Sequence, residues 1–256
     1  MIIAVTSWRG WGASTLALAI ARHLSSHGED AWLIEADPAG GVLAGRVTLD
    51  RTTVGGLERV AFPPERRAPV ELLHEVAHHA GSLHIVTAPL DPFGAGLCHR
   101  PRLQWQDALA ELPGTVVVDI GRWRANSAAW PLLQVADEIV CVLAPEVGAS
   151  VATREWQQAD GRSAPGEVGV PADRLRLAVV DVPGGVAFPR AALLADLGAE
   201  CIGWLPWDAS DVAAVHRLRE PLARRAMRNS YTAEVGRLVA RLGSQLGTET
   251  MELVTS

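Results

Sequence analysis

A glycine-containing segment follows the first apolar run of the chain and leads directly into a segment of helical pattern. It reads Ser7-Trp-Arg-Gly-Trp-Gly-Ala-Ser-Thr15. Glycine lets the backbone turn its N–H groups toward an anion, and the N-terminus of a helix adds about half a positive charge. The Walker A pattern G-x-x-x-x-G-K-[ST] requires a lysine after its last glycine, where this chain has Ala13. The segment therefore predicts a phosphate-binding loop without its lysine.

Short β-rich apolar runs alternate with Ala-, Leu- and Arg-rich segments of helical period. This alternation is typical of βαβ units and predicts a three-layer α/β fold, with a mostly parallel sheet and helices on both faces. Strands are expected at 2–6, 31–35, 83–88, 115–119, 138–143, 175–181 and 201–205, and helices at 14–26, 69–80, 149–159, 191–197, 212–226 and 232–246. Residues 90–102 and 161–170 are expected to be loops, and residues 1–256 to form one domain.

The composition is that of a globular protein with a large core. Of the 256 residues, 48% are hydrophobic and 20% are charged, which excludes a disordered, collagen-like or disulfide-rich chain. The net charge of −6 argues against a surface built throughout for nucleic acid. All 23 basic residues are arginine, so no lysine is available to any site. Cys98, Cys141 and Cys201 lie too far apart for a metal or disulfide framework.

The N-terminal sequence has neither the basic region nor the long apolar region of a signal peptide. No apolar run reaches the ~20 residues that span a bilayer. We therefore expect a cytoplasmic protein, with attachment to the inner face of the membrane through a partner as an open alternative.

The motifs of the chain, in their order, resemble those of the ParA/MinD family of dimeric P-loop ATPases. The family's deviant Walker A motif, K-G-G-x-G-K-[ST], aligns with Trp8-Arg-Gly-Trp-Gly-Ala-Ser14. Glu35-Ala-Asp-Pro-Ala-Gly-Gly41 is similar to the switch I segment, and Val116-Val-Val-Asp-Ile-Gly121 to the Walker B and switch II segment. Gly203-Trp-Leu-Pro-Trp-Asp208 is similar to the family's G-x-[IL]-P-x-D. The resemblance covers essentially the whole chain and implies a P-loop NTPase fold of the ParA/MinD type.

This resemblance also implies roles for particular residues. ATP or ADP would be bound by Arg9, Gly10, Trp11, Gly12, Ala13, Ser14, Thr15, Asp181 and Pro206. Ser14, Asp37 and Asp119 would hold Mg²⁺, which prefers oxygen ligands, and Asp37 would also hold the catalytic water. The alternative is that Ser14 only caps a helix and that the two aspartates only end their strands.

Two departures from the family pattern bear on activity. Trp8 stands at the family's signature lysine, and Ala13 at its P-loop lysine. Loss of one charge-assisted hydrogen bond weakens binding by about 10- to 150-fold, and phosphoryl transfer depends even more on charge stabilisation. Arg9 is a candidate for a compensating cation, although its position places it on the outer side of the loop. Alternatively, Trp8 is a plug that fills the space of the lysine and the phosphates.

Asp181 stands where the family commonly has an asparagine that contacts adenine. An ionised aspartate accepts hydrogen bonds but cannot donate one. The sequence therefore leaves the base open between adenine, guanine and none.

Two other patterns have ordinary structural explanations. His74-Glu-Val-Ala-His78 matches the zinc motif H-E-x-x-H on an expected helix, but a third ligand is missing, and a solvated helix face is favoured. Arginines gather between Arg217 and Arg241, where DNA, anionic lipid or an acidic partner could bind. A helix with its apolar side on the core and its arginines outward is favoured there.

These features predict a degenerate ParA/MinD-like protein that dimerises and recruits a protein partner. It would position or assemble a pilus or secretion system, a septum or a chromosome, with weak or absent ATP hydrolysis. Two alternatives stay open. One is an active ATPase in which Arg9 or an arginine of the partner replaces the lysines, and the other is a nucleotide-free scaffold whose pocket Trp8 closes.

Overall fold

A computed structural model describes residues 1–49, 55–63, 66–100, 105–124, 127–158, 172–182, 188–197, 201–218 and 230–254. The described strands form an eight-stranded sheet in the order β3-β4-β2-β5-β1-β6-β7-β8. They are β1 (Ile2–Ser7), β2 (Ala31–Glu35), β3 (His78–Ala80), β4 (Leu83–Val86), β5 (Thr115–Arg122), β6 (Glu138–Leu143), β7 (Leu175–Val180) and β8 (Cys201–Leu205). Every neighbouring pair is parallel except β3 and β4.

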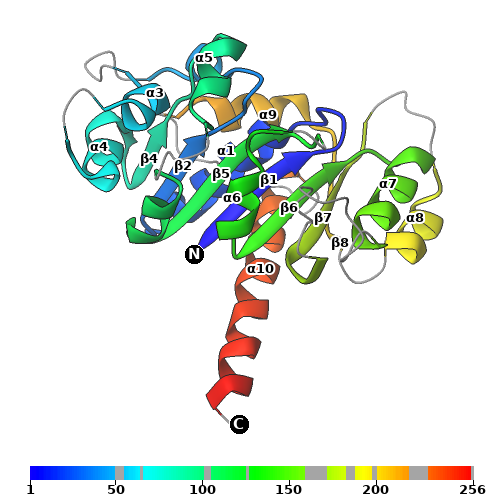
Figure 1. Cartoon of the computed structure of the whole chain (residues 1–256). Coiled ribbons are helices and arrows are strands. Elements are labelled where there is room, and N and C mark those ends of the chain that lie inside the picture. Colours follow the sequence, from blue (N-terminus) through cyan, green and yellow to red (C-terminus); the bar gives the residue numbers. More distant parts are fainter. Residues whose placement is uncertain are drawn as a thin grey trace.

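The sheet is covered by helices on both faces (Figure 1). The described helices are α1 (Ala13–Ser26), α2 (Leu43–Arg46), α3 (Leu57–Ala61), α4 (Pro69–Val76), α5 (Pro92–Leu97), α6 (Trp130–Val135), α7 (Val147–Gln158), α8 (Arg190–Leu197), α9 (Ala209–His216) and α10 (Tyr231–Val254). Short 3₁₀ turns occupy Asp107–Glu111 and Ala172–Arg174.

Alternate residues of the central strands point into two separate apolar layers. On β5, Val116 and Val118 join the layer beneath α3, α4, α6 and α8, whereas Val117 joins the layer beneath α1, α9 and α10. This alternation follows from the two-residue period of a strand, and the strands are apolar on both sides because both faces are covered. The predicted three-layer α/β fold is confirmed.

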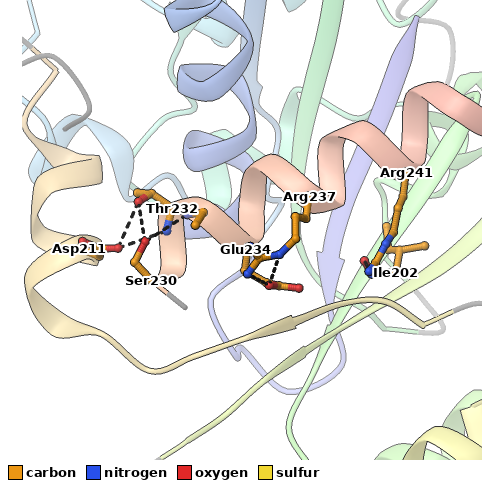
Figure 2. A network of polar contacts seen from close by, with 8 residues as sticks. Ile202, Asp211, Ser230, Thr232, Glu234, Arg237 and Arg241 are labelled. Atoms are coloured by element: carbon orange, nitrogen blue, oxygen red, sulfur yellow. Dashed lines mark hydrogen bonds and ion pairs between the residues drawn. The ribbon is translucent and has the colours of Figure 1, made fainter. Parts of the chain in front are cut away.

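The last helix, α10, packs its first half against α1 and β8, while its final turns extend away from the rest of the molecule (Figure 1). Val235, Leu238 and Leu242 of this helix are buried. On its outer side, Arg237 pairs with Glu234. The Arg241 Nη1 atom donates a hydrogen bond of 2.5 Å to the carbonyl oxygen of Ile202 (Figure 2). This is the core-packed helix that the sequence favours. Four arginines of the same stretch, Arg219, Arg224, Arg225 and Arg228, lie outside the described residues.

The helix expected at 69–80 is wrong in its last third, residues 77–80. It ends at Val76, and His78–Ala80 form instead the edge strand β3, which is antiparallel to β4. Gly81, with φ of 68°, begins the tight turn between the two strands. Hydrogen bonding to the free edge of β4 outweighs the helical pattern of the sequence here. His74 and His78 therefore do not share a helix.

The histidines of the H-E-x-x-H motif pack on aromatic neighbours or pair in the sheet. The centre of the His74 ring lies 4.8 Å from that of the buried Trp32 ring, edge-on to it. His84, which lies outside the motif, stacks on the same indole at 4.4 Å. Among the residues that the structure describes, no group of three or more His, Cys, Asp or Glu is placed to hold a metal ion.

Other boundaries differ from the expected ones in smaller ways. The expected loop at 90–102 contains α5, and the helix expected at 212–226 is described as α9, which ends at His216. The loop expected at 161–170 lies outside the described residues. None of the described helices combines the length and the apolar character of a membrane span.

The packing of α10 gives a test of the fold. Leu238→Ala should lower the free energy of unfolding by about 2–5 kcal/mol, because the side chain is fully buried against β8. Arg237→Ala, which changes an exposed residue one position earlier, should cost less than about 1 kcal/mol. Chemical denaturation measures both, and equal losses for the two variants would contradict this packing of α10.

Candidate functional site

The segment between β1 and α1 forms a loop whose two glycines have left-handed backbone. Gly10 has φ of 82° and Gly12 has φ of 97°, which other residues rarely adopt. Inside the loop, the Trp11 N–H donates to the Ser7 hydroxyl oxygen at 2.6 Å. Gly12 is the N-cap residue of α1 and, as a glycine, offers no side chain to cap that helix. Within the described part of the chain, the N–H groups of its first turn thus have no capping side chain, which suits them to bind an anion.

Ser14 and Asp119 lie side by side at the start of α1 and within β5. Asp119 is fully buried, and burial raises the pKa of its carboxyl from 3.8 to about 7. The Ser14 side chain and the Gly121 N–H act against this rise, and the negative charges of Glu35 and Asp37 add to it. The Asp119 Oδ2 atom has no hydrogen-bond partner among the described residues. A buried carboxylate oxygen without a partner is costly unless it meets a cation or carries a proton.

Glu35, at the end of β2, fixes the segment that carries Asp37. Its carboxylate accepts hydrogen bonds from the N–H groups of Val42 at 2.5 Å, Leu43 at 2.8 Å and Ala88 at 3.0 Å. Burial raises the pKa of Glu35, and these three hydrogen bonds oppose the rise. The side chain therefore ties the segment after β2 to the end of β4.

Asp37 lies directly over a glycine of β5. A Cβ atom at Gly121, which has φ of 68°, would lie 2.0 Å from the Asp37 Oδ2 atom, so only glycine fits there. The Asp37 Oδ1 atom accepts a hydrogen bond from the Ala39 N–H at 2.8 Å. Burial raises the pKa of Asp37, and the positive charges of Arg124 and Arg122 lower it. The structure thus brings Ser14, Asp37 and Asp119 together at the carboxyl end of the sheet.

A shift of register between β1 and β5 shapes this corner. Val5 pairs with Asp119, but Ser7 pairs with Arg122, so β5 has one more residue than β1 between the two pairs. Gly121 lies in this bulge, donates its N–H to the Asp119 Oδ1 atom at 3.1 Å and accepts from the Thr6 hydroxyl at 3.0 Å. Bulges of this kind bend a strand and redirect the side chains that follow.

Two arginines could supply positive charge to the loop: Arg9, which belongs to it, and Arg122, which ends β5. Arg9 is exposed, and its guanidinium carbon lies 4.2 Å from the centre of the Trp8 ring. Arg122 lies closer to the glycines, because a Cβ at Gly10 would be 2.8 Å from the Arg122 Nε atom. Sequence reasoning found Arg9 and missed Arg122, whose approach to the loop depends on the pairing of β1 with β5.

The tryptophans on either side of Gly10 pack into opposite layers. The Trp8 ring lies against Gly148 of α7, where a Cβ would meet its Cη2 atom at 2.7 Å. Trp8 joins the apolar layer of α4 and α6, while Trp11 joins that of α1 and α9. Ala13 is buried in this second layer at the start of α1.

The residues expected to contact a base lie at the ends of two adjacent strands. The Asp181 N–H donates to the carbonyl oxygen of Leu205 at 2.9 Å, so Asp181 is a neighbour of the segment that continues into Pro206. Asp181 is exposed and Pro206 is partly buried. Asp208, the last residue of the similar motif, caps α9, since its Oδ1 atom accepts from the Ser210 and Asp211 N–H groups at 3.0 Å each. The end of this motif therefore has a structural role.

Solved structures share this architecture over nearly the whole chain. The septum site-determining protein MinD of Pyrococcus horikoshii, complexed with Mg-ADP, has a TM-score of 0.72 at 13% identity, over 96% of this chain and 97% of that one. The fold is that of the ParA and MinD ATPases. A ParA family ATPase of Chlorobium tepidum has a TM-score of 0.68 at 16% identity, over 91% of this chain and 96% of that one. The MinC:MinD complex of Aquifex aeolicus has a TM-score of 0.68 at 18% identity, over 95% of this chain and 96% of that one.

No protein-family model matches this sequence, and neither does any curated protein. The ParA/MinD fold is thus shown by the structural comparison.

The buried carboxyl of Asp119 gives a pH-dependent prediction. Between about pH 4 and pH 7 the folded chain keeps a proton on Asp119 that the unfolded chain releases, so stability falls as the pH rises through this window. Asp119→Asn cannot titrate. Its free energy of unfolding should therefore rise relative to the unaltered chain by on the order of 1 kcal/mol per pH unit across this window and stay constant above it. Denaturation at pH 4, 5.5, 7 and 8.5 measures this difference, and a difference that does not change with pH would refute the prediction.

Proposed function

We propose that this chain binds a magnesium nucleotide at the loop between β1 and α1. In our proposal it acts as a degenerate ParA/MinD-like regulator of position or assembly, with weak or absent hydrolysis. The observation that carries the proposal is the meeting of Ser14, Asp37 and Asp119 beside a glycine loop with left-handed backbone. These residues come from three separate segments, and a helix cap with two strand ends does not require them to meet.

The described residues fit both the magnesium ion and the phosphates of the proposed ligand. Hydroxyl and carboxylate oxygens are the ligands that Mg²⁺ prefers, and the buried Asp119 Oδ2 atom has no other partner in the described structure. Phosphates would be held by the N–H groups of the loop and by the first turn of α1, from Arg9 to Thr15. A bound magnesium ion would supply positive charge to the phosphates, which matters more here because the loop has no lysine.

The base would lie at the ends of β7 and β8, beside Asp181 and Pro206. Asp181 is exposed and, when ionised, accepts hydrogen bonds only, so it could pair with the amine of adenine or with the N1 and N2 edge of guanine. The proposal therefore includes ATP, ADP and GTP as ligands to be compared.

The proposed role in the cell is positioning through a homodimer and a protein partner, in a pilus or secretion, division or chromosome system. Support comes from the neighbours in fold, which include a MinD protein complexed with Mg-ADP and a complex of MinD with MinC. The absence of both motif lysines supports weak turnover, because phosphoryl transfer depends on positive charge around the phosphates.

Binding and assembly are tested together in one sample. Calorimetry with ATP, ADP and GTP in the presence of Mg²⁺ should give a dissociation constant below about 1 mM for at least one nucleotide, equivalent to about 4 kcal/mol. Light scattering should show a doubled mass with the triphosphate. Asp119→Asn should lose the dependence of affinity on Mg²⁺, whereas Asp107→Asn, an exposed acid in the 3₁₀ turn that precedes β5, should keep it. Absence of binding at millimolar nucleotide would refute the proposal and favour a nucleotide-free scaffold.

Phosphate release separates a regulator with residual hydrolysis from one with none. Asp37→Ala should abolish any nucleotide-dependent release of phosphate, because Asp37 is the acid proposed to hold the attacking water. If the unaltered chain releases phosphate no faster than Asp37→Ala, the alternative of an active ATPase is excluded. A rate within the common enzyme range of about 1–10³ s⁻¹ would instead contradict the proposal of weak hydrolysis.

A further inference from the structure

Arg122 places a positive charge on the loop from an unexpected element. Its guanidinium packs against Gly10, since a Cβ there would lie 2.8 Å from Nε and 3.2 Å from Nη2. Arg122 ends β5, and its backbone pairs with Ser7, from which the loop starts. Its side chain makes no hydrogen bond or ion pair with another residue that the structure describes. The donors of a guanidinium, five N–H groups in a fixed fork, thus remain for a ligand.

The surroundings of Arg122 point to an anion that arrives with a metal ion. Asp119, three residues earlier on β5, is fully buried and has an oxygen with no hydrogen-bond partner among the described residues, which suits it to hold a cation. The N–H groups at the start of α1 have no side-chain cap from the residues that the structure describes, which suits them to bind an anion. A phosphate chain with bound magnesium would supply a cation to the Asp119 carboxylate and an anion to the N–H groups of α1.

Arg9 is less suited to this role. Its guanidinium carbon is 4.2 Å from the centre of the Trp8 ring, a distance at which a cation and an indole attract each other. Trp8 in turn packs against Gly148 of α7. Arg9 would have to leave its aromatic neighbour to reach a phosphate, whereas Arg122 already lies against the loop.

We propose that Arg122 binds the phosphate groups of the nucleotide and replaces the loop lysine that this chain lacks. This proposal rests on the proposed function. A guanidinium presents parallel N–H donors in a fixed planar fork that matches two phosphate oxygens, whereas a lysine presents its three donors from a single nitrogen as a compact point charge. Nucleotides with two or three phosphates should therefore depend on Arg122 more than a nucleoside monophosphate does.

The test compares arginine variants by calorimetry with Mg-ATP and with AMP. Arg122→Ala should weaken Mg-ATP binding by about 10- to 150-fold, the loss expected for one charge-assisted contact, and should change AMP binding far less. Arg122→Lys keeps the charge and should recover part of the affinity. Arg237→Ala, which removes an exposed arginine of α10, is the matched control and should bind Mg-ATP like the unaltered chain. Circular dichroism and a denaturation curve for each variant show whether it is folded.

The outcomes separate this proposal from the proposed function. If the unaltered chain binds Mg-ATP and folded Arg122→Ala binds it within about twofold, Arg122 is not the phosphate cation, while nucleotide binding stands. A larger loss in Arg9→Ala than in Arg122→Ala also overturns the proposal and assigns the role to Arg9. If Arg122→Ala does not fold, Arg122→Lys and Arg122→Gln decide, and equal affinity of these two variants refutes a role for the charge. Failure of the unaltered chain to bind any nucleotide refutes both proposals.

Discussion

The extra residue of β5 opposite β1 is the constraint on which the site depends. Because Val5 pairs with Asp119 and Ser7 with Arg122, the strand bends at Gly121. The bulge leaves room for the Asp37 carboxylate above Gly121 and brings Arg122 to the loop. With the register unbroken, Ser7 would face Gly121, and every side chain after Asp119 would exchange faces. A backbone irregularity therefore decides which charges meet at this corner of the sheet.

Around this bulge, negative and positive groups hold each other in place. Glu35 ties the segment after β2 to the end of β4 through three backbone N–H groups. The positive charges of Arg124 and Arg122 lower the pKa of Asp37, two residues later. Asp119 is buried between the sheet and α1. Each carboxylate thus has a different environment. Glu35 accepts three hydrogen bonds, Asp37 lies beside arginines, and Asp119 has an oxygen with no hydrogen-bond partner among the described residues.

Sequence reasoning located the parts of this site whose chemistry is local. The loop from Ser7 to Thr15 could be found because it follows a short apolar run and leads into a helical pattern. The acids Asp37 and Asp119 were implied by the resemblance of their segments to those of the ParA/MinD family. Arg122 could not be found, because its contact with Gly10 depends on strand pairing across more than a hundred residues of sequence. The local signal was Gly121, a glycine two residues after a predicted strand.

The fold shows the same division between local and distant causes. Strands with short, mostly apolar runs, such as β2, β6 and β8, have the predicted boundaries. The strand β3 was predicted as helix, since His78–Ala80 continue a helical pattern and become a strand only by pairing with β4. A pattern within one segment could not reveal the free edge of another.

The two tryptophans of the loop attach it to the apolar layers on both faces of the sheet. Trp8 packs into one apolar layer and against α7, and Trp11 packs into the other layer beneath α1. Gly10, between them, is thus held from both sides of the sheet. A rearrangement of the loop that moves both rings would therefore change the packing of helices on opposite faces of the sheet. Their indoles also make that event visible as a change of intrinsic fluorescence.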